Sequence, residues 1–120
     1  VEPSFVKHIN VHGTSTPLGD IGEAKAIRTI FGADAPPVTS TKGVTGHLIA
    51  GAGAVEAIIA TLTMRDKSIP PTANLNNQDE QIDLDVVSGS PRSYDGGAVM
   101  SNSFGFGGHN AAVLITPYES

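Results

Sequence analysis

Residues 48–65 read LIAGAGAVEAIIATLTMR and contain the longest apolar run of the sequence. Drawn as a helix, this stretch is apolar almost all round, and a helix without a polar face belongs in a protein interior. Gly51 and Gly53 lie near its start, where each costs about 1 kcal/mol relative to alanine. Close approach of another backbone would offset that cost. The stretch therefore predicts a central helix, packed on both sides, in a compact α/β protein.

Glu56 is the one carboxylate within this apolar helix. An unpaired carboxylate in a protein interior is destabilising by several kcal/mol. Lys42 lies in the turn that leads into the same helix, and it is the candidate partner for a buried ion pair. The alternative is that Glu56 reaches solvent through a gap in the packing.

The segment before this helix alternates between strand and helix patterns. Phe, Val and Ile residues over 5–11 predict a buried strand. Residues 20–31 carry an apolar stripe that predicts a helix, which Gly32 ends. Asp20 is the expected N-cap of that helix, because Glu23 follows it at the spacing of a capping box.

The remaining segments complete a mixed sheet with helices on its faces. The expected elements are a strand over 38–41, a tight polar turn over 42–47, a surface loop over 68–82, a strand over 84–87, and an antiparallel pair over 98–103 and 111–116. Strand, helix, strand and helix followed by two terminal strands are typical of an α/β fold whose sheet contains both parallel and antiparallel pairs.

Composition narrows the range of functions. The 120 residues fit one domain or a piece of one, and a chain that begins with Val and soon enters a strand suggests a fragment. The seven Lys and Arg residues are scattered and the net charge is −5, so no nucleic-acid surface is expected. The sequence has no cysteine for a disulfide or thiolate site. Because no signal peptide or membrane span is visible, we expect a cytoplasmic protein.

Two of the four histidines stand at positions suited to chemistry. His12 follows the first predicted strand, and His47 precedes the apolar helix, whose dipole disfavours the charged imidazolium. Two neutral imidazoles at the mouth of one sheet could donate hydrogen bonds to the same thioester or ketone oxygen. The competing interpretation of His12 is a purely structural hydrogen bond.

Neither a metal nor a dinucleotide is expected to bind. On a strand, His8 and His12 would lie about 13 Å apart, and we assign His8 to a surface or edge position. His47 and His109 have no His, Cys or Glu at ligand spacing. The glycines of GAGAVE and FGFGG do not stand between a strand and a helix start, as a dinucleotide fingerprint requires.

Four motifs follow one another along the chain: HGTSTPLGD at 12–20, STKGVTGH at 40–47, GAGAVEA at 51–57 and NSFGFGGHN at 102–110. Together with IPPTANL and IDLDVV, they resemble the C-terminal part of an elongating β-ketoacyl-acyl-carrier-protein synthase, a condensing enzyme of the thiolase-like superfamily. The resemblance covers essentially all 120 residues. It implies a fold of two similar halves, each with a five-stranded mixed sheet. Residues 1–120 would form most of the C-terminal half, without its first strand and helix.

The resemblance also implies functional residues and no cofactor. The expected catalytic residues are His12, Lys42, His47 and Glu56. The two histidines would hydrogen-bond a malonyl thioester carbonyl, and the lysine would pair with the glutamate. Thr14 and Thr16 match hydroxyls that bind the pantetheine arm, and Phe106 matches a gating phenylalanine whose backbone N–H contributes to the oxyanion hole. His109 stands where many members have threonine, and no role is assigned to it.

The nucleophilic cysteine of the resembled family lies in its N-terminal half, outside these residues. The parent enzyme would catalyse decarboxylative Claisen condensation in fatty-acid elongation, and the fragment alone would be inactive. Expected partners are an acyl carrier protein bearing malonyl and acyl thioesters, the N-terminal half and a second subunit. The alternatives are a polyketide-type ketosynthase, a thiolase, which Lys42 disfavours, and a non-catalytic half-domain that binds a carrier protein or another partner.

Overall fold

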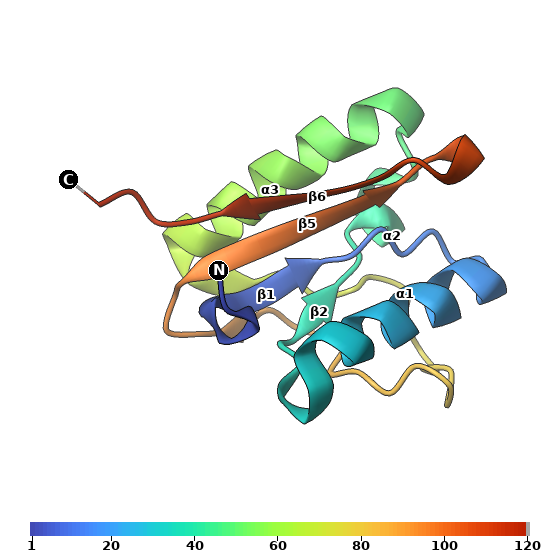
Figure 1. Cartoon of the computed structure of the whole chain (residues 1–120), viewed down its shortest axis with the longest axis horizontal. Coiled ribbons are helices and arrows are strands. Elements are labelled where there is room, and N and C mark those ends of the chain that lie inside the picture. The colour runs from blue at the N-terminus through green and yellow to red at the C-terminus, as the bar shows by residue number, and fades with distance from the viewer. Residues whose placement is uncertain (120) are drawn as a thin grey trace.

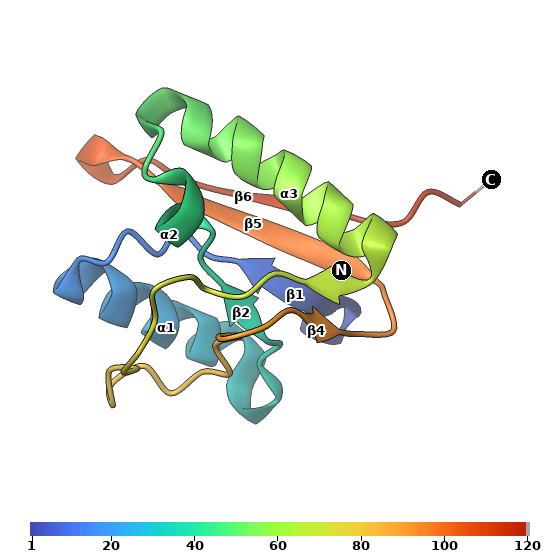
Figure 2. The same ribbon diagram turned by 180° about the vertical axis from the view of Figure 1, so that it is seen from behind.

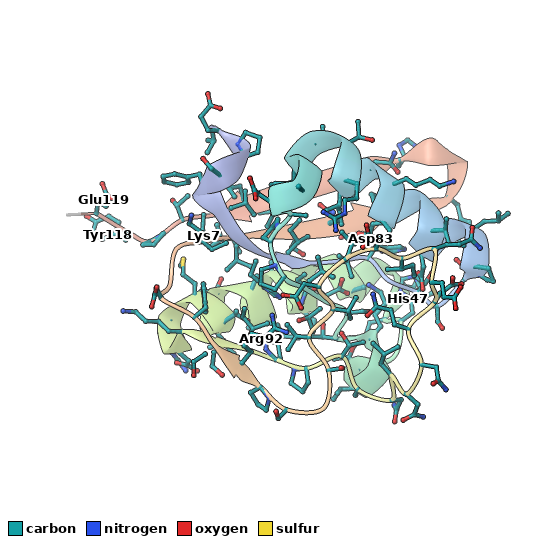
Figure 3. The ribbon with its side chains drawn as sticks, turned by 90° about the horizontal axis from the view of Figure 1, so that it is seen from below. Lys7, His47, Asp83, Arg92, Tyr118 and Glu119 are labelled. Carbon is teal, nitrogen blue, oxygen red and sulfur yellow. The ribbon has the colours of Figure 1, made fainter. Side chains whose placement is uncertain are left out.

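A computed structural model describes residues 1–119. A four-stranded sheet with the order β2-β1-β5-β6 lies between helices α1 and α3, which cover its opposite faces (Figures 1 and 3). The central strand β1 (Val6–Asn10) runs parallel to β2 (Val38–Thr39) and to β5 (Ala98–Phe104). Strand β6 (Asn110–Ile115) returns antiparallel to β5. The mixed α/β architecture and the terminal antiparallel pair are as predicted.

The helices and the smaller elements complete the fold. They are the α-helices α1 (Pro17–Phe31), α2 (Lys42–Thr45) and α3 (Ala52–Asp66), the 3₁₀ turns η1 (Pro3–Phe5), η2 (Gly32–Asp34), η3 (Ile49–Gly51) and η4 (Phe106–Gly108), and a two-stranded antiparallel sheet of β3 (Ser68–Ile69) and β4 (Arg92–Ser93). From behind, the segment between β3 and β4 is seen to pass across β2 and α1 (Figure 2).

Several predicted boundaries differ from the structure. Within residues 1–119 the main sheet has four strands instead of five. The strand expected over 84–87 is reduced to a single bridge between Val86 and Val38. The polar turn over 42–47 contains the short helix α2, and the apolar helix is entered through η3. Short elements of this kind depend on which partners the folded chain supplies, which a sequence pattern does not reveal.

The face of the sheet that α1 covers is apolar. Val6 and Ile9 of β1 form one buried cluster with Val38 of β2 and Ile27 of α1. Gly32 ends α1 with φ +64°, as predicted.

The predicted cap of α1 is wrong. The helix begins at Pro17, after Thr16, so that Asp20 lies inside its first turn. The carboxylates of Asp20 and Glu23 do not form a capping box, because both accept hydrogen bonds from backbone N–H groups of the preceding turn over 12–15.

The opposite face carries α3, whose two sides differ. Ala52, Glu56, Ala60 and Thr63 form its buried side, whereas Ile58 is 61% exposed. The expected packing on both sides is therefore not realised among residues 1–119. Leu62, one turn further along, is 40% exposed, so this side of α3 presents apolar side chains to solvent. Within the same range, no helix is both long and apolar enough to cross a membrane.

His8 is fully buried, so its predicted surface position is wrong. It alternates with Ile9 along β1 and therefore points to the face that α3 covers. Its Nε2 lies 3.1 Å from Thr39 Oγ1, and that hydroxyl donates its proton to the Pro70 carbonyl at 2.8 Å. His8 Nε2 is consequently the donor of the first bond. Burial lowers the pKa of His8 to about 4, so the ring is neutral at pH 7.

The buried neutral His8 makes stability fall in mild acid. Because its pKa is about 4 in the folded chain against an ordinary value of 6.5, its contribution is complete above pH 6.5 and is lost as the pH falls toward 4. Between pH 7 and pH 5 the loss amounts to about 2 kcal/mol of unfolding free energy. Urea unfolding at pH 5, 6 and 7 should show this loss in the wild type and not in His8→Gln, which keeps a side-chain donor for Thr39. Equal pH slopes in the two proteins would contradict the assignment.

Candidate functional site

His12 stands on a turn that follows the carboxyl end of β1, and Glu23 of α1 holds that turn. The Glu23 carboxylate accepts the backbone N–H of His12 at 2.9 Å and that of Gly13 at 3.1 Å. Its Oε1 also accepts Asn102 Nδ2 at 3.3 Å. Burial raises the pKa of Glu23, and these three hydrogen bonds oppose the rise. This role was not predicted from the sequence, because the spacing between Asp20 and Glu23 indicated a capping box at the start of their own helix.

Lys42 and His47 stand on a second turn, which follows β2. Lys42 opens α2, and Gly46 ends it with φ +70°. Gly43 lies so close to the next segment that a Cβ atom there would approach the Ala73 carbonyl oxygen to 2.5 Å. His47 Nδ1 accepts the backbone N–H of Ile49 at 3.3 Å. In the neutral ring the proton is therefore on Nε2, which leaves a donor for a ligand.

The two turns bring the rings of His12 and His47 together. Their centroids are 5.4 Å apart and the rings are perpendicular. Phe104, at the end of β5, packs against His12 with a centroid distance of 5.3 Å; this residue was not predicted to belong to the site. Burial, then the positive charge of Lys42 and then His47 lower the pKa of His12. His12 is therefore a neutral ring at pH 7.

The buried ion pair is present as predicted. Lys42 Nζ donates to both carboxylate oxygens of Glu56, at 2.7 and 2.9 Å. The side chains are 5% and 2% exposed, so the alternative in which Glu56 reaches solvent is wrong. The pair joins α2 to α3.

The other predicted site residues, Thr14, Thr16 and Phe106, lie on the surface around the two histidines. Thr14 Oγ1 and Thr16 Oγ1 are 3.3 Å apart on the His12 turn. Phe106 is 97% exposed at the tip of the loop after β5, a loop closed by the hydrogen bond from Gly105 N to the His109 carbonyl at 2.7 Å. The structure thus brings together the histidines and the ion pair, and leaves Phe106 apart from them.

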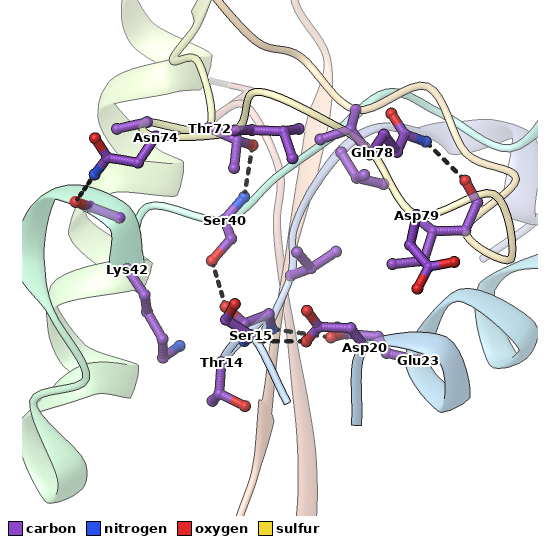
Figure 4. A pocket seen from close by; sticks show the side chains of 18 of the residues that line it. Thr14, Ser15, Asp20, Glu23, Ser40, Lys42, Thr72, Asn74, Gln78 and Asp79 are labelled. Carbon is purple, nitrogen blue, oxygen red and sulfur yellow. Dashed lines mark hydrogen bonds between the residues drawn. The ribbon is translucent and has the colours of Figure 1, made fainter. Parts of the chain in front are cut away.

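Two pockets flank the histidines. The larger, of about 360 Å³, extends from His47 and Lys42 past Thr14 and Ser40 to Asn74 (Figure 4). The smaller, of about 290 Å³, is lined by His12, His47 and Phe104. Among residues 1–119 no three His, Cys, Asp or Glu side chains are grouped so as to hold a metal ion. The arrangement offers a ligand two imidazole rings beside a buried ion pair.

This site and this sheet define a domain of the condensing-enzyme type, and comparison with known proteins agrees. Residues 1–76 match the family model described as beta-ketoacyl synthase, C-terminal domain. The chain is 48% identical, over 98% of its length, to the 3-oxoacyl-[acyl-carrier-protein] synthase 2 of Mycobacterium leprae strain TN. The chain belongs to the beta-ketoacyl synthase family. It spans 28% of the length of that relative.

Solved structures show the same fold. The ishigamide ketosynthase/chain length factor superposes with a TM-score of 0.96 and 34% identity, over 99% of this chain and 30% of the other. A type II PKS acyl-carrier protein in complex with its ketosynthase bound to the hexaketide gives a TM-score of 0.94 and 31% identity, over 99% and 30% of the two chains. The fold is that of the C-terminal part of a thiolase-like ketosynthase.

Breaking the buried pair at one end should be strongly destabilising. Glu56→Ala leaves the Lys42 ammonium buried without its carboxylate, and we expect a loss of about 3–5 kcal/mol of unfolding free energy, measured by urea unfolding. Asp66→Ala is the matched control, since it removes an exposed carboxylate bonded to Arg65 at 2.6 Å and should leave stability unchanged within error. A small effect of Glu56→Ala would mean that water reaches the pair in solution.

Proposed function

We propose that these residues form the C-terminal catalytic part of a 3-oxoacyl-[acyl-carrier-protein] synthase, an acyltransferase that elongates fatty acids by decarboxylative condensation. The observation that carries the proposal is the perpendicular contact of His12 with His47, 5.4 Å between centroids, at the mouth of the sheet. The 48% identity to a curated enzyme of that name supports it.

In the proposed reaction the histidines serve decarboxylation. The carbonyl oxygen of a malonyl thioester accepts hydrogen bonds from His47 Nε2–H and from the His12 ring. The bond between the malonyl α-carbon and its carboxylate breaks, CO₂ leaves, and the electron pair moves onto the thioester as an enolate. Two positioned donors stabilise the negative charge that develops on its oxygen. A hydrogen bond of this kind needs one ring N–H from each histidine and transfers no proton.

The second half of the reaction needs a group that these residues do not supply. The enolate carbon attacks the carbonyl of an acyl group held as a thioester on a cysteine, a new carbon–carbon bond forms, and the cysteine thiolate leaves. We assign that cysteine to the N-terminal part of the parent polypeptide. Residues 1–120 alone would then be inactive in condensation.

The remaining assignments follow the same proposal. Lys42 and Glu56 hold the site and supply a fixed positive charge beside His12, Thr14 and Thr16 bind the pantetheine arm, and Phe106 gates entry. The buried charge of the Lys42–Glu56 pair, with side chains 5% and 2% exposed, supports a dedicated site over a passive scaffold.

The proposed partners are an acyl carrier protein, the N-terminal half and a second subunit of the parent enzyme, which we place in the cytoplasm. A carrier protein is bound by the ketosynthase in one of the similar solved structures, and this supports the first partner. A polyketide-type ketosynthase is the second candidate, since the same structure comes from such a system. The higher identity to the fatty-acid enzyme, 48% against 31%, favours elongation. Mass spectrometry of the carrier-bound product would separate a single extension from a poly-β-ketone.

Removing either histidine should strongly reduce the rate of decarboxylation. In the full-length parent, His12→Ala and His47→Ala should each lower the rate of CO₂ release from malonyl-carrier protein by about 10²–10³-fold, the usual effect of losing one oxyanion donor. His8→Gln, on β1 and outside the site, is the control and should leave the rate unchanged at pH 7.5. Undiminished CO₂ release in both alanine variants would refute their assignment, and a parent that releases none would favour a non-catalytic binding domain.

A further inference from the structure

Ser40 lies between the two turns that carry the proposed catalytic groups. It follows β2 and precedes α2. Its Oγ donates a hydrogen bond of 2.8 Å to the carbonyl of Gly13, the residue after His12. The N–H of the same Gly13 is held by Glu23 at 3.1 Å. Side chains from two different parts of the fold therefore fix both polar groups of this one residue.

The contact between Gly13 and Ser40 is tight. Gly13 has φ +43°, and a Cβ atom placed on it would lie 2.7 Å from Ser40 Cβ and 2.8 Å from Ser40 Oγ. No side chain other than hydrogen fits there. The His12 turn thus rests directly on Ser40, and a displacement of Ser40 moves the backbone next to His12.

Ser40 is itself held by the segment after β3. Its backbone N–H donates to Thr72 Oγ1 at 3.2 Å, and Thr72 N donates to the Val87 carbonyl at 2.7 Å. Two residues on, Asn74 Nδ2 donates to the Gly43 carbonyl at 3.1 Å. Figure 4 shows this line of hydrogen bonds from Thr72 through Ser40 to the turn that Asp20 and Glu23 hold.

We propose that Ser40 is a positioning residue of the site: its hydroxyl sets the place of the His12 turn relative to the turn that carries Lys42 and His47. The inference rests on the proposed function. Its proton is engaged by the Gly13 carbonyl, so Ser40 acts through the backbone and not on the substrate. Two donors serve one oxygen only when both are correctly placed, and a displacement of about 1 Å can lower a rate by about 10²-fold.

The test uses the full-length parent and malonyl-carrier protein, with CO₂ release as the readout. Ser40→Ala should lower kcat by about 10-fold or more and leave KM within about twofold, because substrate contacts are unchanged. Ser40→Thr keeps the hydroxyl that donates to the Gly13 carbonyl and should restore kcat to within about threefold of the wild type. Thr29→Ala is the control, as it removes a hydroxyl-to-carbonyl bond of the same 2.8 Å on exposed α1.

The outcomes separate this inference from the proposed function. An active parent with an unchanged Ser40→Ala variant overturns the role of Ser40 alone. So does a raised KM at constant kcat, which would make Ser40 a substrate contact, or an equal loss in Ser40→Ala and Ser40→Thr. An inactive parent overturns the proposed function and this inference with it. If Ser40→Ala does not fold, the variants Thr72→Val and Thr72→Ser are measured instead, because Thr72 Oγ1 holds the Ser40 backbone. A loss of kcat in Thr72→Val and its retention in Thr72→Ser support the positioning role of Ser40. Equal activity in the two variants refutes it.

Discussion

The ion pair between Lys42 and Glu56 is the constraint on which the arrangement of the site depends. Two buried charges stabilise the fold only while they stay in contact, since either one alone would be left in a medium of low polarity. The pair therefore fixes α2 against α3 and determines which side of α3 faces the sheet. Glu56, Ala60 and Thr63 form that side. With α2 fixed, His47 follows at a set place beside the end of β1.

The two faces of the sheet differ in composition: one is apolar and the other carries buried polar side chains. On the face covered by α1, the buried residues Ile9, Ile27 and Val38 form an apolar cluster. On the face covered by α3, His8, Asn10 and Thr39 are fully buried polar residues. The apolar face provides most of the stabilisation that burial brings. The polar face is stable only when its side chains find specific hydrogen-bond partners. The candidate site lies beyond the carboxyl ends of β1 and β2, where α/β proteins commonly place functional groups.

A feature of this fold is predictable from the sequence when the contact that determines it joins residues close together in the chain. The partner of Glu56 was predictable, because a carboxylate in an apolar helix needs a cation and Lys42 stood in the preceding turn. The antiparallel pair β5 and β6 was also predictable, because two apolar segments are joined by a short glycine-rich loop. His8 was misplaced because its hydrogen-bond partner Thr39 lies 31 residues further along the chain, beyond the reach of a local pattern. Glu23 was misread because its spacing from Asp20 fits a capping box, whereas the N–H groups that it accepts belong to His12 and Gly13, 11 and 10 residues earlier in the chain.

Different contacts prepare the two histidines to donate a hydrogen bond: one affects the pKa of His12 and the other affects the tautomer of His47. For His12, burial and the nearby Lys42 ammonium lower the pKa and so keep the ring uncharged. For His47, the Ile49 N–H occupies Nδ1 and so directs the proton to Nε2. The cation that completes the buried pair thus adds to the effect of burial in lowering the pKa of the ring beside it. Replacing the pair by apolar residues of similar volume could preserve the fold, but it would remove the positive charge that helps to keep His12 neutral. The need for that charge beside the site gives a reason to retain a buried ion pair that stability alone does not provide.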